Sequence, residues 1–256
     1  MKKIKLLKAK IIEVSARSRE GHIPSAFSVM DLLWVLYDRV LNVSPETVSD
    51  PDRDIFILSK GHASLGLYAI LLEKGFVDQT AFDDFGKLNN CLGGHPDRTK
   101  VGGIEASTGS LGHGLPMAVG VALGIKIKNK KNKVYTIVGD GECNEGTIWE
   151  SAMLASHHGL NNLCCIIDNN GSSERALRLG NLAEKFSAFG WDTDIIDGHD
   201  HAEIYRALKR KPSDRPRAII ANTIKGKGCK VMENNPEWHH KSPTSAELAG
   251  IIAALY

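Results

Sequence analysis

The stretch VYTIVGDGECNEGTIWESAMLASHHGLNNLCCIIDNNGSSE, residues 134–174, determines how the whole chain is interpreted. Two apolar runs, 133–139 and 163–169, lead into polar turns, Gly-Asp-Gly after the first and Asp-Asn-Asn-Gly after the second. Between the turns, residues 145–158 have the apolar spacing of a helix. The predicted inner face of this helix consists of Ile148, Trp149, Ala152 and Met153. Two strands joined by a helix form a β-α-β unit, so the two strands are expected to run parallel.

The rest of the chain repeats this alternation of strands and helices. Further apolar runs are predicted to be strands at 54–59, 189–198 and 216–224. Helices are predicted at 3–19, 28–41, 61–75 and 111–128. A last helix is predicted after Thr244, because Glu247 stands three residues later at capping-box spacing before an apolar run.

Several of these strands lack polar alternation, which is typical of strands that are buried on both faces. We therefore predict an α/β fold, a doubly wound and mainly parallel sheet with helices on both faces. The capped final helix favours a complete unit, so residues 1–256 are predicted to form a single domain.

The composition excludes several classes of protein. The chain has 32 Lys and Arg against 30 Asp and Glu, a net charge of +2, which does not favour binding to nucleic acid or to an anionic membrane. No apolar run approaches the length of a membrane span. The five cysteines form no Cys-x-x-Cys pair, so we expect a reduced, cytoplasmic setting, with Cys164 and Cys165 as small core residues.

Asp140 and Asn170 follow the two strands of the quoted stretch. Because the carboxyl ends of parallel strands meet at one edge of a sheet, the two side chains are expected to converge although thirty residues separate them. Their oxygens suit Mg²⁺ or Ca²⁺, with phosphate oxygens and water completing the shell. Gly139 and Gly141 allow backbone to approach a diphosphate, and the N-terminus of the following helix favours an anion.

Either turn alone is a common loop without a metal. A dinucleotide site is less well supported, because GDGECNEG lacks the G-x-G-x-x-G spacing and the chain contains no Walker loop. The pair of turns on one β-α-β unit is the more specific pattern.

Asp140 to Asn170 resembles the thiamine-diphosphate signature, and the neighbouring text resembles transketolases in particular. The matching segments, in the order of the family, are LSKGHASLGLYAILLEKG (58–75), GGHPD (93–97), STGSLGHGLPMAVGVAL (107–123), GDGECNEGTIWESAM (139–153) and IKGKGCKVMENNPEWHH (224–240). The chain is similar to the short, separately encoded N-terminal subunits of split transketolases.

The resemblance implies thiamine diphosphate and Mg²⁺ as cofactors, with Ca²⁺ or Mn²⁺ as alternative ions. It assigns the ion to Asp140, Asn170 and the Ser172 carbonyl. The positions implied to contact the cofactor are His62, Gly109, Ser110, Leu111, His113, Gly139, Asp140, Gly141, Glu142 and Asn170.

Four histidines match those that line the family's substrate channel, and are implied to be catalytic: His22, His62, His95 and His239. Each step of ketol transfer moves a proton on or off a sugar oxygen, which suits groups that titrate near neutrality. Glu145 is implied to belong to an acidic relay between paired cofactor sites. The remaining histidines considered lie outside the motifs and are interpreted as structural: His157, His158, His199 and His201.

The family places the catalytic glutamate on a second α/β domain that grips the pyrimidine ring. All the motifs of this chain belong to the diphosphate-binding half, so the resemblance implies a partner chain, the C-terminal transketolase subunit, and an α₂β₂ assembly. The implied reaction transfers a two-carbon ketol unit from a ketose to an aldose, as sugars or sugar phosphates.

The segment 171–188 departs most from the family, because it lacks the usual Ile-Asp-Gly after Asn170. We expect this segment to influence substrate choice, and the donor and acceptor sugars stay open. Two alternatives remain at this point: a subunit similar to 1-deoxyxylulose-phosphate synthase, and a non-catalytic α/β protein that retains the fold.

Overall fold

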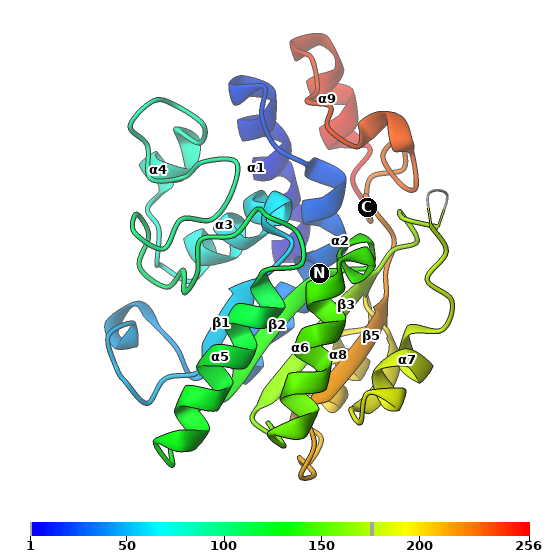
Figure 1. The fold of residues 1–256 in the computed structure, drawn as a ribbon. Helices are drawn as coiled ribbons and strands as arrows, with labels where there is room; N and C mark the ends of the chain where they lie inside the picture. Colours follow the sequence, from blue (N-terminus) through cyan, green and yellow to red (C-terminus); the bar gives the residue numbers. More distant parts are fainter. Residues whose placement is uncertain (1, 175–176) are drawn as a thin grey trace.

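The computed structural model describes residues 2–174 and 177–256, and its centre is a five-stranded parallel sheet (Figure 1). The strand order is β1-β2-β3-β5-β4, and every pair of neighbouring strands is parallel. The strands are β1 (Ile55–Leu58), β2 (Val134–Gly139), β3 (Leu163–Asn169), β4 (Asp192–Asp197) and β5 (Arg217–Asn222). The predicted α/β fold with a parallel sheet is confirmed.

Helices cover both faces of the sheet. The helices of the described residues are α1 (Lys2–Ser18), α2 (Ile23–Val35), α3 (Ser64–Glu73), α4 (Gln79–Asp83), α5 (Gly114–Ile127), α6 (Gly146–His157), α7 (Leu182–Ala188), α8 (His201–Lys209) and α9 (Ser245–Ala253). Buried side chains of α1, α2, α3 and α8 form the larger apolar core on one face, and those of α5, α6 and α7 form the second core on the other. In Figure 1, α5 and α6 lie side by side in front of the sheet.

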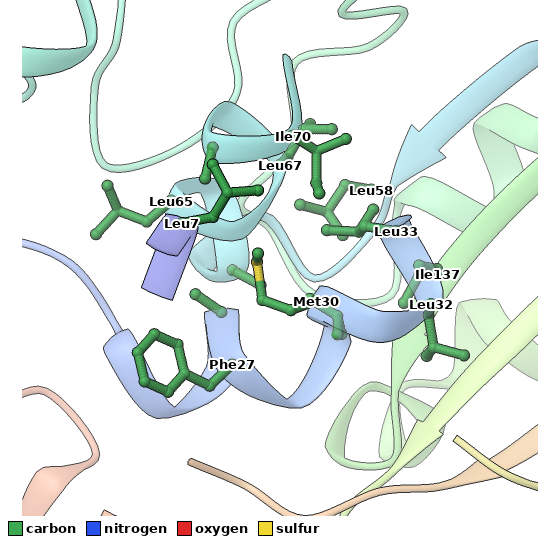
Figure 2. Close-up of a cluster of buried hydrophobic side chains, with 14 of the residues drawn as sticks. Leu7, Phe27, Met30, Leu32, Leu33, Leu58, Leu65, Leu67, Ile70 and Ile137 are labelled. Atoms are coloured by element: carbon green, nitrogen blue, oxygen red, sulfur yellow. The ribbon is translucent and has the colours of Figure 1, made fainter. Parts of the chain in front are cut away.

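The larger core is packed where α2 and α3 meet the first strands (Figure 2). Phe27 and Met30 on α2 are fully buried and share this cluster with Ile70 of α3 and Leu58 of β1. Each fully buried side chain of this size stabilises the fold by about 1.5–3 kcal/mol relative to exposure. This core fixes the start of α2 and the loop after β1, and both segments contribute to the site described below.

The pairing of β2 with β3 sets the register of the predicted site. Gly139 lies opposite Asp168, so Asp140 and Asn170 leave the sheet at the same edge and nearly the same height. The strand interiors are buried in β1, β2, β3 and β5, as their unbroken apolar runs indicated. β4 is an edge strand and is mostly part-exposed, which explains its polar residues.

Two local predictions were wrong. The helix predicted at 28–41 begins at Ile23, because Pro24 is accommodated in its first turn, and it ends in a π-helical turn over Leu36–Val40. Met153 was expected on the inner face of α6 but is 51% exposed. The buried face of α6 instead follows Ile148, Ala152 and Ala155, which recur at the spacing of one helix face.

The final helix has its predicted cap, because Thr244 and Glu247 form the reciprocal hydrogen bonds of a capping box. The cysteines are free thiols, and Cys164 and Cys165 are buried in the sheet as expected. Among the residues described here, no helix has both the length and the apolar character needed to cross a membrane.

Candidate active site

A cavity of about 380 Å³ opens at the carboxyl edge of the sheet. Its lining comes from segments far apart in the sequence: His22, Ser25, Lys60, His62, His95, Gly109, Leu111, Gly139, Asp140, Gly141, Glu142, Asn170, Ser172, Ser173, Lys225 and His239. A second hollow of about 340 Å³ shares Asn170, Ser172, Lys225 and His239 with it. The structure therefore brings most of the predicted site residues to one place.

Asp140 and Asn170 meet as predicted. The backbone N–H of Ser172 donates to Asp140 Oδ2 at 3.1 Å and to Asn170 Oδ1 at 3.1 Å. Gly141 N–H donates to Asp140 Oδ1 at 2.7 Å. Burial, together with the negative charge of Asp168 nearby, raises the pKa of Asp140, so a cation beside this carboxylate would relieve an unfavourable charge.

The glycines beside Asp140 leave open space. A Cβ added at Gly139 or Gly141 would meet no atom nearer than 3.9 Å, so larger side chains there would extend into unfilled volume. Gly109 has φ +150° and its added Cβ would lie 3.0 Å from the His95 ring, so only glycine fits this close approach without movement. A wall without side chains suits a phosphate group held by backbone atoms.

The oxygen donors fit a hard cation only in part. Among residues 2–174 and 177–256, no group of three or more His, Cys, Asp or Glu is arranged to hold a metal ion. Asp140 and Asn170 can supply two oxygens, and phosphate oxygens and water would supply others, as hard divalent cations accept. Ser172 presents its N–H to both oxygens, so the role of its carbonyl as a third ligand stays a prediction.

Glu142 holds the cavity wall together. Its buried carboxylate accepts hydrogen bonds from Ser59 Oγ at 2.7 Å and from the N–H groups of Gly112 and Gly139 at 2.9 Å each. Burial raises the pKa of Glu142, and these three donors oppose that rise. The carboxylate thereby ties the turn that carries Leu111 to the end of β2.

The four predicted histidines lie around the cavity. The His22 ring centroid is 5.3 Å from that of His62 and 5.7 Å from that of His239. Burial, and then the neighbouring histidines His240 and His239, lower the pKa of His22 to about 4. Burial lowers the pKa of His62 to about 2, and the charge of Lys60 acts in the same direction. Both rings are therefore neutral at pH 7, and the expectation that they titrate near neutrality is wrong for His22 and His62, because burial disfavours their charged forms.

The sequence reasoning missed several residues near the cavity, and three of them have basic side chains. His240 lies against His22, with ring centroids 4.4 Å apart. Lys225 Nζ is 3.0 Å from His239 Nδ1, and burial followed by repulsion from Lys60 lowers the pKa of Lys225. Lys60 is buried and forms an ion pair with Asp168. All three stand inside motifs that had already been singled out, and that position was the available signal.

The remaining predicted positions lie at the margin. Ser110 Oγ and His113 Nδ1 are 3.2 Å apart at the start of α5, and both residues are exposed. Glu145 is exposed at the N-terminus of α6 and is not part of the cavity lining. The histidines interpreted as structural include His199 and His201, which each contact Asp31 at 2.8 Å, outside the cavity lining.

Comparisons with known proteins show which family the chain is similar to. Residues 1–252 match the family described as transketolase, thiamine diphosphate binding domain. The chain is 39% identical over 254 residues to an apulose-4-phosphate transketolase subunit from Actinobacillus succinogenes, covering 96% of this chain and 92% of that protein. It is 46% identical over 210 residues to a protein named ferredoxin fas2 from Rhodococcoides fascians, covering 82% of this chain and 69% of that protein.

Among solved structures, transketolase from Campylobacter jejuni superposes with a TM-score of 0.88 at 30% identity. The match covers 98% of this chain but only 41% of that transketolase.

Proposed function

The chain belongs to the transketolase family, and we propose that it is the diphosphate-binding subunit of a two-chain, thiamine-diphosphate-dependent transketolase. The observation that carries the proposal is that Asp140 and Asn170 both accept a hydrogen bond from Ser172 N–H. They do so in a cavity that is also lined by glycines and four histidines. The relatives named as transketolase subunits do not favour the alternative related to 1-deoxyxylulose-phosphate synthase.

Asp140 and Asn170 would hold a Mg²⁺ ion, because a carboxylate and an amide oxygen are the ligands that this ion accepts alongside phosphate. Gly139 and Gly141 would leave room for the diphosphate itself. When bound, thiamine diphosphate supplies the nucleophilic carbon and the electron sink for cleavage of a ketose C–C bond. The protein contributes the placement of that group against the histidines.

His22 and His62 would act on the sugar as neutral rings. A neutral imidazole offers one N–H donor and one acceptor nitrogen, so each ring can hold a sugar hydroxyl by a hydrogen bond. The low pKa values of both rings keep the acceptor nitrogen available through the neutral range. Lys225, close to His239, adds a positive charge that suits a phosphorylated sugar.

The substrates would be a ketose donor and an aldose acceptor, free or phosphorylated. The named substrate of the Actinobacillus relative is a phosphorylated sugar, which supports this class. The segment 171–188, which we propose to influence substrate choice, includes residues 175 and 176, which lie outside the described residues.

A second subunit would complete the active site with the pyrimidine-binding domain and its catalytic glutamate. The chain spans 92% of the Actinobacillus relative but 41% of the Campylobacter transketolase, which supports this division. We propose that residues 1–256 form one domain and that the complex works in the cytoplasm, in keeping with its free cysteines.

The outer face of α5 and α6 supports an α₂β₂ arrangement. Met117 and Val121 on α5 and Met153 and Leu154 on α6 are exposed apolar side chains on adjacent helices. Glu145 is exposed where α6 begins. We propose that this face packs against the same face of a second copy, which would bring the two copies of Glu145 near the two-fold axis.

The test is reconstitution. The chain would be mixed with the product of a neighbouring reading frame that encodes a pyrimidine-binding subunit, with thiamine diphosphate, Mg²⁺ and a ketose–aldose pair. Ketol transfer should require both chains, and calorimetry should show cofactor binding that depends on Mg²⁺. Turnover by this chain alone would refute the two-chain assignment, and the absence of any cofactor binding would favour the non-catalytic alternative.

A further inference from the structure

We propose that Asp168 is the positioning residue of the cation site. It selects which atom of the Asn170 amide faces Asp140, and its ion pair with Lys60 leaves the charge of Asp140 for the cation. This inference rests on the proposed function, because it concerns the site in which Mg²⁺ and the diphosphate would bind.

Asp168 is fully buried near the end of β3 and accepts hydrogen bonds from four side chains. Its Oδ2 accepts from Ser28 Oγ at 2.7 Å, from Asn170 Nδ2 at 3.0 Å and from Lys60 Nζ. Its Oδ1 accepts from Thr223 Oγ1. Both oxygens are therefore occupied by protein donors, which makes Asp168 a poor candidate for a direct metal ligand.

The hydrogen bond to Asn170 has a chemical consequence. An amide side chain has one acceptor oxygen and one donor nitrogen, and the two can exchange places by rotation. An ionised carboxylate can only accept, so Asp168 requires the nitrogen of Asn170 to face it. The oxygen of Asn170 must then face the other way, where it accepts from Ser172 N–H at 3.1 Å beside Asp140. With the opposite rotation, N–H groups would face Asp140 and could not bind a cation.

The ion pair with Lys60 determines how charge is divided. Asp140 and Asp168 lie on adjacent strand ends, where the backbone N–H of Asp140 donates to the backbone carbonyl of Asp168 at 3.1 Å. Lys60 is 2% exposed and Asp168 is 0% exposed, so solvent screens their attraction very little. Because Lys60 compensates Asp168, a divalent cation is attracted to the carboxylate of Asp140 and not shared between two acids.

The same carboxylate connects the cation site to the histidine cavity. Lys60 stands two residues before His62, and Thr223 stands two residues before Lys225. Hydrogen bonds from both loops end on Asp168, so its orientation constrains the two loops together with Asn170. Groups that orient a metal ligand typically change metal affinity by 10–100-fold when they are removed.

The test compares three variants of the full chain assembled with its partner subunit. D168N leaves one acceptor oxygen and one donor nitrogen at position 168, so it no longer requires the nitrogen of Asn170 to face it, and the double variant D168N/N170D exchanges the amide and the carboxylate between the two positions. S28A removes a different donor to Asp168 and leaves the amide contact in place, so it is the matched control. The readouts are the Mg²⁺ concentration that half-saturates thiamine-diphosphate binding, by calorimetry, and Mn²⁺ binding, by electron paramagnetic resonance.

D168N should raise the half-saturating Mg²⁺ concentration by about 10–100-fold. The double variant should recover most of that loss, because the new amide at position 168 can donate to the new carboxylate at position 170, which cannot present a nitrogen to the ion. S28A should change the value by less than about threefold, since it does not reorient Asn170. A purely structural role for Asp168 would lower thermal stability without this exchange-dependent recovery.

Two results would overturn the proposal. One is an unchanged Mg²⁺ dependence in folded D168N, with folding checked by circular dichroism. The other is a folded double variant that binds Mg²⁺ no better than D168N. If D168N binds too weakly or folds too poorly to be measured, the double variant is compared with wild type instead, and a double variant without Mg²⁺-dependent binding then overturns the proposal. Failure of the wild-type complex to bind thiamine diphosphate with Mg²⁺ would instead refute the proposed function.

Discussion

Replacing Lys60 by Met tests how the buried charge beneath the active site is stabilised. Lys60 and Asp168 are almost completely buried, and their side chains form an ion pair. Met is close to Lys in length and shape, so the substitution removes the charge and its hydrogen bond without creating a large cavity. Asp168 would keep its other donors, Ser28, Thr223 and Asn170.

Breaking one side of a buried ion pair typically costs 3–5 kcal/mol, because the remaining charge is left without compensation. The three donors that remain on Asp168 favour the lower end of this range, roughly 3 kcal/mol. For a protein of this size, such a loss corresponds to a fall in Tm of about 6–12 °C. The double variant K60M/D168N removes both charges and should recover a large part of the loss.

The difference in stability between wild type and K60M should depend on pH, through the ionisation of Asp168. Burial acts to raise the pKa of Asp168, but the charge and hydrogen bond of Lys60 hold it below its usual value. A lowered native pKa stabilises the wild type above the unfolded pKa of about 3.9, and this stability is lost as pH falls through the native pKa. Without Lys60, burial should raise the native pKa above the unfolded one, so the variant should gain relative stability as Asp168 takes up a proton. The difference between wild type and K60M should therefore shrink from pH 7 to pH 4.

Urea unfolding followed by circular dichroism at several pH values would measure these differences. K3M is the matched control, because Lys3 forms an exposed ion pair with Glu73 and its removal should scarcely change stability. A K60M variant as stable as wild type at pH 7, or one whose deficit grows toward pH 4, would refute the reasoning.

Three other predictions follow from the same structure. D140A should weaken Mg²⁺-dependent binding of thiamine diphosphate by more than the roughly 10–100-fold typical of a group that only orients a ligand, and normal affinity in calorimetry would contradict the cation assignment. V121E places a charge on the exposed apolar face of α5 and should convert the proposed α₂β₂ complex to αβ in light scattering, whereas an unchanged mass would exclude this face as the interface. I11A empties a fully buried position and should lower the free energy of unfolding by about 2–5 kcal/mol; a loss well below 1 kcal/mol in urea unfolding would contradict close packing there.

Predictions from local sequence were accurate where a short pattern determines the structure. The capping box at Thr244 depends on residues three apart, and it forms as expected. Apolar runs marked the strands because a parallel sheet covered by helices buries both faces. The meeting of Asp140 and Asn170 also followed from one β-α-β unit, since the ends of parallel strands share an edge.

The sequence predictions were wrong where tertiary packing decides which of two neighbouring residues is buried. Met153 is apolar and next to Ala152, so periodicity alone did not separate them. The sheet favours the small side chains of α6, Ala152 and Ala155, because they allow the helix to approach closely, and Met153 is left at the surface. That exposure becomes informative once the face is considered as an interface between subunits.

Lys60 shows why part of the site could not be predicted from the sequence. A lysine is usually at the surface, and its partner Asp168 is 108 residues away. The pair also requires the strand order, because β1 and β3 are separated by β2, so the side chain of Lys60 must cross the end of β2 to reach Asp168. It passes beside Gly139, where an added Cβ would lie 3.9 Å from Lys60 Cδ, the distance of an ordinary van der Waals contact. The ion pair therefore depends on the strand order of the sheet, which brings the loop after β1 and the end of β3 to the same edge, and no short sequence pattern contains that information.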